Sequence, residues 1–155
     1  MNFKKATILL IIFIAGIVIG GYLFRDVQPR SFLKIDDCDK NCLNPNELLG
    51  LIGSVGIQNL SGLMPFVVKE TDKTVVIDSP IHEAPIHYVI IPKKDIKDVS
   101  DISETDKEYL IDAYAVIGEI VRKENLTQYK IYTNGPYYQT VTYLHFHLLA
   151  NEGGK

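Results

Sequence analysis

The chain has 155 residues, a length that favours one domain with an additional segment. Its net charge is −3 at pH 7 and it has no marked cluster of Lys and Arg, which argues against a nucleic acid polymer as its main partner. A small nucleotide is not excluded, because it needs one pocket and not a basic surface. Cys38 and Cys42 are the only cysteines, and a C-x3-C pair cannot by itself complete a four-ligand zinc site.

The amino-terminal part contains a long uncharged stretch, residues 6–24. In a helix its 19 residues would span about 28 Å, enough to cross the hydrocarbon core of a bilayer. A cleaved signal peptide is the alternative, but its apolar region normally has about 7–15 residues, and no clear small-x-small cleavage site follows Gly21. We therefore expect residues 1–24 to form an uncleaved, single-pass membrane anchor.

The side of the membrane on which the domain lies is less clearly marked. Lys4 and Lys5 precede the uncharged stretch, while Arg25, Arg30 and Lys34 follow it, so the positive-inside rule hardly decides. The two cysteines could close a small disulfide loop, which persists only in an oxidising compartment, or remain reduced thiols. We expect the amino terminus inside and the domain outside the cytoplasm.

Residues 25–43 are polar and are interpreted as a linker, and residues 44–64 as a short helical lead-in. Asn44 and Pro45 form a typical helix start, with Asn as the cap and Pro at the first helical position. The following NELLGLIGSVG has apolar residues at helical spacing, but its three glycines predict a short or frayed helix. We expect its apolar residues to cover the surface of the domain, among them Leu48, Leu49 and Ile52.

From residue 65 the pattern changes to β-branched runs separated by turn residues, with one long helical segment among them. The third run is almost entirely apolar, so we expect it to be buried on both faces. The order β-β-β-α-β-β predicts an α+β fold for residues 65–150, an antiparallel five-stranded sheet with one long helix packed on it, followed by a tail at 151–155. The predicted strands are 66–70, 74–79, 87–92, 129–134 and 142–149, and the predicted helix is 104–124.

Two of the four histidines, His145 and His147, stand one residue apart in the last predicted strand. Because successive side chains of a strand point to opposite faces, Tyr143, His145 and His147 should share one face, while the apolar residues between them face the core. Surface histidines, or a metal pair that would need a third ligand, are the ordinary interpretations of this spacing. The spacing alone therefore does not establish catalysis.

A longer pattern surrounds the pair. The pattern begins with HYVIIPKKDIKDVSDISETD, in which an apolar strand ends in IPK. A long predicted helix follows. After the helix comes YKIYTNGPYYQTVTYLHFHLLA, which contains TNG, QTV and HFHLLA in that order. In this order and spacing, residues 66–150 resemble the histidine triad (HIT) superfamily of nucleotide hydrolases and transferases. The branch they resemble most is the Hint-like one, whose members hydrolyse nucleoside phosphoramidates such as AMP-amine compounds.

The resemblance implies roles for individual positions. His145 matches the nucleophile, His147 the histidine that contacts the phosphate and the bridging oxygen, and His87 the histidine that helps to place and orient this cluster. Attack by a neutral His145 would form a nucleotidyl-histidine, which water then hydrolyses. The implied substrate contacts are Asn134 near the ribose and phosphate, Gln139 and Thr140 at the phosphate and leaving group, and Asp78 at the ribose, although Asp78 is displaced by one residue from the family's spacing.

The main departure from the family is Tyr143, which replaces the first histidine of the triad. If that position contributes mainly its backbone carbonyl, which accepts the proton on the nucleophile's other nitrogen, tyrosine changes little. Some members bind a structural zinc through an early C-x2-C pair, a histidine just after IPK-x and this same first histidine. Here those positions hold residues 64–66, Asp95 and Tyr143, so the zinc site is missing as a unit. We expect catalysis to be retained, with no cofactor and no metal.

The resulting expectation is a membrane-anchored enzyme that cleaves purine nucleoside phosphoramidates or related nucleotidyl bonds. One alternative is a dinucleoside polyphosphate hydrolase. Another is a non-catalytic nucleotide-binding module, which Tyr143 would favour. The resemblance also implies a homodimer that pairs through the long helix and the fourth strand.

Overall fold

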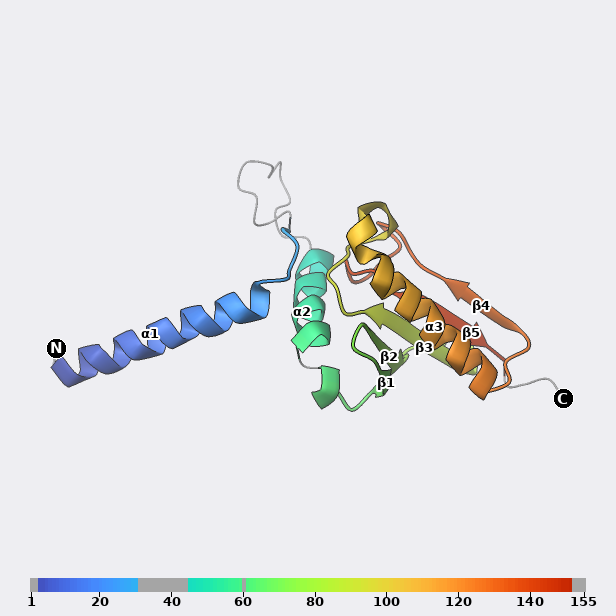
Figure 1. The fold of residues 1–155 in the computed structure, drawn as a ribbon, viewed down its shortest axis with the longest axis horizontal. Coiled ribbons are helices and arrows are strands. Elements are labelled where there is room, and N and C mark those ends of the chain that lie inside the picture. Colours follow the sequence, from blue (N-terminus) through green and yellow to red (C-terminus); the bar gives the residue numbers. More distant parts are fainter. Residues whose placement is uncertain (1–2, 31–44, 60, 152–155) are drawn as a thin grey trace.

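The computed structural model describes residues 3–30, 45–59 and 61–151, whose arrangement is shown in Figure 1. A long helix projects from one side of a folded unit in which helices cover an antiparallel sheet. Cys38, Cys42, most of the predicted linker and residues 152–155 lie outside the described residues, so the predictions made for them stay predictions.

The sheet has five strands in the order β1-β2-β3-β5-β4, and every neighbouring pair is antiparallel. This confirms the predicted α+β fold. The last strand lies inside the sheet, between β3 and β4, so its side chains have neighbours on both sides. The strands are β1 Val67–Glu70, β2 Thr74–Asp78, β3 Ile86–Pro92, β4 Tyr129–Tyr132 and β5 Phe146–Ala150.

The fifth strand begins four residues later than predicted, at Phe146, whereas the other strands agree with the prediction to within two residues. Residues 139–145 form an irregular segment, which we call the 139–145 loop. Its backbone amides bond to partners outside the sheet: that of Leu144 donates to Ile96 O at 2.6 Å, and that of Thr142 donates to Asn46 O at 3.1 Å. Tyr143 and His145 are therefore positioned by a loop and not by the ladder of the strand.

Helix α3, Lys107–Lys123, covers one face of the sheet (Figure 1). It follows the 3₁₀ turn Glu104–Asp106, where the Ser103 amide donates to Oδ2 of Asp106 at 2.8 Å and so gains a partner that the helix itself cannot provide. Two further 3₁₀ turns lie at Ser61–Leu63 and Val99–Asp101. The apolar face of α3 packs on the sheet in a buried cluster that includes Ala113, Val116, Ile117, Ile120, Ile90, Phe146 and Leu148.

Helix α2, Pro45–Asn59, lies against the opposite face of the sheet. There Ile57 packs in a second buried cluster with residues of β2, β3 and the 139–145 loop. Strand β3 buries Ile90 towards α3, and Val89 and Ile91 towards α2. The prediction that both faces of this strand are covered is confirmed.

The prediction for α2 is wrong in two respects. The helix is continuous over 15 residues despite its three glycines, and Leu48, Leu49 and Ile52 are exposed instead of covering the domain. The face that meets the domain carries the buried Gly50, because the helix approaches the 139–145 loop closely. A Cβ at Gly50 would overlap the backbone carbonyl of Thr142, so the contact requires a residue without a side chain.

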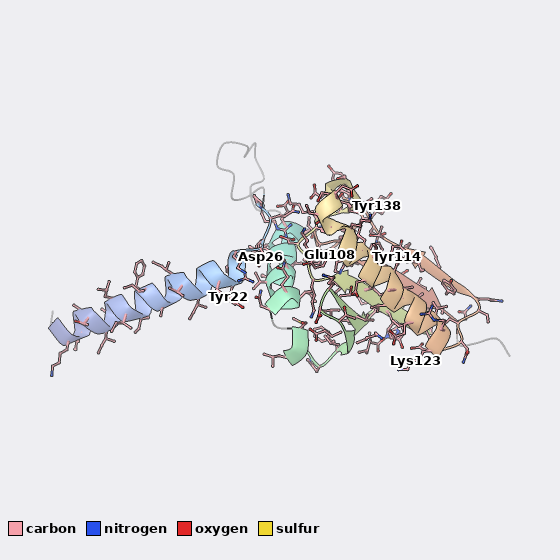
Figure 2. All side chains as sticks on the ribbon, in the orientation of Figure 1. Tyr22, Asp26, Glu108, Tyr114, Lys123 and Tyr138 are labelled. Atoms are coloured by element: carbon pink, nitrogen blue, oxygen red, sulfur yellow. The ribbon has the colours of Figure 1, made fainter. Side chains whose placement is uncertain are left out.

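Helix α1, Phe3–Phe24, is long and apolar enough to cross a membrane over Lys4–Phe24. The protein buries none of that apolar segment, and Figure 2 shows its side chains projecting on both sides of the helix into open space. A helix of this length, composition and position is common to membrane anchors and signal sequences.

We expect Gly50→Ala to destabilise the protein and Gly53→Ala, its matched control, not to. Replacing a helical glycine by alanine gains up to about 1 kcal/mol. At Gly53 the added methyl group meets only the side chain of Val141, at an ordinary 3.8 Å. At Gly50 it meets the Thr142 backbone, and the strain should outweigh the gain by about 1–3 kcal/mol. Urea unfolding of the full-length protein in detergent measures both, and equal stabilities would contradict the close approach.

Candidate functional site

Three histidines, His87 of β3, His147 of β5 and His145 of the 139–145 loop, meet on the α2 side of the sheet. In the antiparallel pair β3–β5, Val89 lies opposite His147, and His87 lies two residues away on the same face. His87 Nε2 and His147 Nδ1 are 2.8 Å apart, and the rings of His145 and His147 are 4.9 Å apart in an edge-to-face arrangement. The structure thus brings together the three residues that the sequence predicts to be catalytic.

Hydrogen bonds assign the protons of His87 and His147. The Glu83 amide donates to His87 Nδ1 at 3.2 Å, so a neutral His87 carries its proton on Nε2. That proton is donated to His147 Nδ1, which leaves the proton of a neutral His147 on Nε2. His147 Nε2 is buried and has no hydrogen-bond partner within the described part of the chain. The site therefore holds an N–H donor that a ligand could use.

His145 has the opposite tautomer. Its Nδ1 lies 2.7 Å from the backbone carbonyl oxygen of Tyr143, which can only accept a hydrogen bond. Nδ1 therefore carries the proton, and Nε2 of the neutral ring keeps a free lone pair. Nucleophilic attack needs that lone pair, and position 143 provides its carbonyl whatever side chain it has.

The surroundings keep both imidazoles neutral near pH 7. Burial lowers the pKa of His145, and the hydrogen bond to the Tyr143 carbonyl opposes this only in part. Burial, followed by the proximity of His145 and His87, lowers the pKa of His147 to about 4. The carboxylate of Glu83 acts in the opposite direction on this pKa and is outweighed.

Tyr143 and Asp95 occupy two of the positions compared above with zinc ligands. Both side chains form hydrogen bonds with other residues of this chain. Tyr143 is buried, and its hydroxyl donates to Pro92 O at 2.7 Å. Asp95 is also buried and pairs with Arg30 at 2.6 Å, while the Gln28 amide donates to its other oxygen at 2.7 Å. Burial nevertheless raises the pKa of the Asp95 carboxyl above its usual value. Across residues 3–30, 45–59 and 61–151, no three His, Cys, Asp or Glu side chains are grouped as metal ligands would be.

The 139–145 loop is also bonded to segments that are far away in the sequence. Arg30 donates to the Thr142 carbonyl oxygen at 3.3 Å. At the start of α2, Nδ2 of Asn46 donates to the Gln139 carbonyl oxygen at 3.1 Å. The loop, and with it the carbonyl that orients His145, is therefore held from outside the sheet.

A largely apolar pocket of about 170 Å³ opens beside His145. Gly53 and Ile57 of α2 line it together with apolar residues of β2 and β3. This volume is below the range of about 300–1,000 Å³ that is usual for ligand pockets, and its apolar lining suits a flat ring system better than a phosphate.

The four predicted substrate contacts are not gathered at one point. Thr140 is exposed and lines the apolar pocket. Gln139 is buried, and its side-chain amide donates to Asn134 O at 2.7 Å, so these two residues are bonded to each other. Asp78 lines a neighbouring hollow and lies 3.6 Å from Nε2 of His82. Their roles at a substrate stay predictions.

Two residues that contact the histidine cluster were not predicted, Tyr132 and Glu83. Tyr132 lies opposite His147 in the β4–β5 pair and stacks on its ring, with the centroids 4.6 Å apart. Burial and a hydrogen bond from its hydroxyl to the Glu83 carboxylate, at 2.9 Å, raise the pKa of Tyr132 to about 12. Lys130 Nζ lies 4.7 Å from the centroid of the same ring. Only the register between β4 and β5, which the sequence does not reveal, places Tyr132 on His147.

Comparison with known proteins identifies a family. Residues 64–154 match the model of the family described as scavenger mRNA decapping enzyme C-term binding, a stretch that includes the whole sheet, α3 and the three histidines. The chain is also 34% identical over 86 residues to an uncharacterized HIT-like protein of Chlamydia trachomatis, an alignment that covers 54% of this chain and 78% of that protein.

Solved structures give the same result. The chain is similar to a HIT family hydrolase from Clostridium thermocellum, with a TM-score of 0.56 and 29% identity, over 65% of this chain and 94% of that one. It is also similar to a histidine triad protein from Clostridium difficile, with a TM-score of 0.57 and 28% identity, over 67% of this chain and 90% of that one. These matches confirm the expected superfamily and fold, and they do not bear on the Hint-like branch.

We expect nuclear magnetic resonance of ¹⁵N-histidine-labelled protein to find His145 and His147 neutral at pH 7, with their protons on Nδ1 and Nε2 respectively. His147 should titrate near pH 4 in the folded protein. The same protein in concentrated urea is the control, because unfolded histidines titrate near pH 6.5. A folded His147 that also titrates near pH 6.5 would contradict the assigned geometry.

The lowered pKa of His147 also affects the free energy of unfolding. Between about pH 6.5 and 4 the unfolded chain binds a proton at this position and the folded chain does not. The contribution of His147 to stability is therefore fully present above pH 6.5 and is lost as the pH falls through this interval.

Proposed function

Because this chain belongs to the histidine triad superfamily, we propose that it is a hydrolase or transferase that cleaves purine nucleoside phosphoramidates and related nucleotidyl bonds, with His145 as the nucleophile. Its fold is that of HIT family hydrolases. The observation that carries the proposal is the hydrogen bond from His145 Nδ1 to the Tyr143 carbonyl, which leaves Nε2 with a free lone pair beside the pocket.

The proposed reaction has two displacements. In the first, His145 Nε2 attacks phosphorus, the bond from phosphorus to the amine nitrogen breaks, and the amine departs with a proton from water. In the second, a water molecule attacks the nucleotidyl-histidine, which releases the nucleoside monophosphate and a proton and restores the neutral imidazole. One difficult displacement is thereby divided into two easier ones.

Hydrogen-bond donors near His145 would stabilise the charge on the phosphoryl oxygens. The buried Nε2–H of His147 is aligned by His87, and the Thr140 hydroxyl lines the same pocket as His145. We propose that Gln139 contributes its backbone amide, because its side chain is already bonded to another residue. The purine base would then occupy the apolar pocket.

The leaving group would lie on the opposite side of the phosphate from the base. The apolar pocket is lined by His145 but not by His147, whereas Tyr132 stacks on His147 and holds the carboxylate of Glu83. A carboxylate at this place attracts a cationic amine and repels a polyphosphate, which supports the phosphoramidate assignment. The nearby charge of Lys130 is the observation that favours the second candidate, a dinucleoside polyphosphate hydrolase.

We further propose that α1 anchors the protein in a membrane, with the domain outside the cytoplasm, and that the protein forms a homodimer through α3 and β4. Ile111 and Tyr114 of α3 are exposed, although the Tyr114 ring also contacts Phe146 of β5, with the centroids 5.4 Å apart. Two large apolar side chains at the middle of a helix supply surface that such a dimer would cover.

We expect the full-length protein in detergent to cleave a fluorogenic AMP-amine substrate, and His145→Ala to lower the rate on the order of 10³-fold, because the nucleophile is removed. His82→Ala is the control for the loss of an imidazole. Its exposed ring lies edge-on to His87 and its Nε2 lies 3.6 Å from Asp78, but no hydrogen bond among the described residues joins it to His145, so this variant should lose far less activity than His145→Ala. Mass spectrometry of wild-type protein quenched in alkali should detect the nucleotidyl adduct. Equal background rates in wild type and His145→Ala would leave only the non-catalytic nucleotide-binding module.

Two charge substitutions separate the leaving-group classes. Glu83→Gln keeps the backbone amide that bonds to His87 but removes the charge, so it should lower the preference for a cationic over an uncharged amine by about fivefold, equivalent to about 1 kcal/mol. Lys130→Gln should raise the same preference and lower any activity on a dinucleoside polyphosphate. Both effects are measured as the ratio of kcat/KM for a cationic amine substrate to kcat/KM for an uncharged one. Ratios that both variants leave unchanged would contradict the proposal that Glu83 and Lys130 select the leaving group by charge.

A further inference from the structure

Helix α2 has an apolar outer face that the domain does not cover. Leu48, Leu49 and Ile52 are 44%, 49% and 61% exposed, and they project from the side of the helix opposite Gly50. Residues at these spacings lie within one turn of each other, so they form one patch. Glu47 is the only charged residue among the fifteen of α2. Exposing such an apolar helix face, with almost no charged residue beside it, to water is unfavourable.

The connection between α1 and the domain is short and fixed. Arg30 is completely buried in its ion pair with Asp95, and the Gln28 amide donates to the same carboxylate. The four residue steps from Phe24, the last residue of α1, to Gln28 can span at most about 14 Å. Wherever α1 ends, the surface of the domain must therefore be close by.

The element that is closest to the end of α1 is α2. The two helices are in contact, and Figure 1 shows α2 between α1 and the sheet, running across the direction of α1. If α1 stands along the normal of a bilayer, α2 lies along the bilayer surface. In Figure 2, Tyr22 and Asp26 mark the end of α1 beside α2. The Arg25 guanidinium lies 4.9 Å from the centroid of the Tyr22 ring, and such an aromatic and basic pair is typical of a helix end at a membrane–water interface.

We propose that α2 docks on the same bilayer that α1 crosses, with Leu48, Leu49 and Ile52 inserted at its interface. The proposal rests on the proposed role of α1 as an anchor. An apolar helix face beside a membrane-spanning helix meets acyl chains without any further partner. The opposite side of α2 carries Gly53 and Ile57 into the pocket beside His145, so α2 separates the bilayer from the candidate site by the thickness of one helix.

Tryptophan reporters test this directly, because the chain contains no tryptophan of its own. Ile52→Trp is compared with Ile111→Trp in full-length protein reconstituted into phosphatidylcholine vesicles. The two isoleucines are matched, since both lie in helices and are 61% and 60% exposed, but Ile111 belongs to α3 on the other face of the sheet. Phosphatidylcholine brominated on its acyl chains should quench Ile52→Trp severalfold more than Ile111→Trp. Leu48→Trp replaces Ile52→Trp if that variant does not fold.

Each other outcome overturns the proposal. Equal quenching of the two reporters would show that α2 is no closer to lipid than α3 is. A blue-shifted but unquenched reporter at Ile52 would place α2 against a second protein molecule. A third reporter, Ile14→Trp within α1, tests the anchor separately. If it is not quenched, the anchor and the docking both fail, and if it is quenched while Ile52→Trp is not, only the docking fails.

Discussion

One hydrogen bond, from Nδ1 of His145 to the carbonyl oxygen of Tyr143, determines what the candidate site can do. It fixes the tautomer of the ring and directs the free lone pair away from the backbone. Because the acceptor is a main-chain carbonyl, the bond does not depend on a histidine at position 143. The tyrosine ring adds a second fixed point, since its buried hydroxyl bonds to Pro92 O. Tyrosine at position 143 therefore adds a hydrogen bond that fixes the loop, and it leaves unchanged the backbone carbonyl that accepts the proton of His145.

The sheet and α3 could be predicted because each depends on short-range patterns, whereas the meeting of the three histidines was expected only from the resemblance to the histidine triad superfamily. Alternating β-branched residues mark the strands, and apolar residues at three- and four-residue steps mark α3. The start of β5 could not be predicted in this way. Residues 140–142 are β-branched and resemble a strand, but the backbone amide of Thr142 donates to Asn46 O and that of Leu144 donates to Ile96 O, both distant in the sequence. Local propensity was overruled by long-range hydrogen bonds.

The error in α2 and the unpredicted burial of Arg30 have the same origin. Apolar residues normally face a core, yet Gly50 faces the domain because only a glycine permits the close approach to Thr142. Arg30 stands in a polar stretch, and nothing in the sequence around it indicates that it is buried. Its partner Asp95 lies 65 residues further along the chain. A buried ion pair of this kind contributes little net stability, but removing one partner leaves the other charge uncompensated. Its effect here is to fix the segment after α1 to the loop that carries the Tyr143 carbonyl.

The chain of hydrogen bonds behind His147 ends at a peptide group, the amide of Glu83, and not at an acid. A peptide N–H does not ionise, so it cannot replace a proton that the two imidazoles give up. If His147 released its Nε2 proton, the pair would be left as an imidazolate, which is far too basic to persist at neutral pH. His147 is thus restricted to polarising its ligand while keeping its proton. A basic leaving group such as an amine must therefore take its proton from the solvent, whereas a weakly basic one such as a phosphate can leave without a proton.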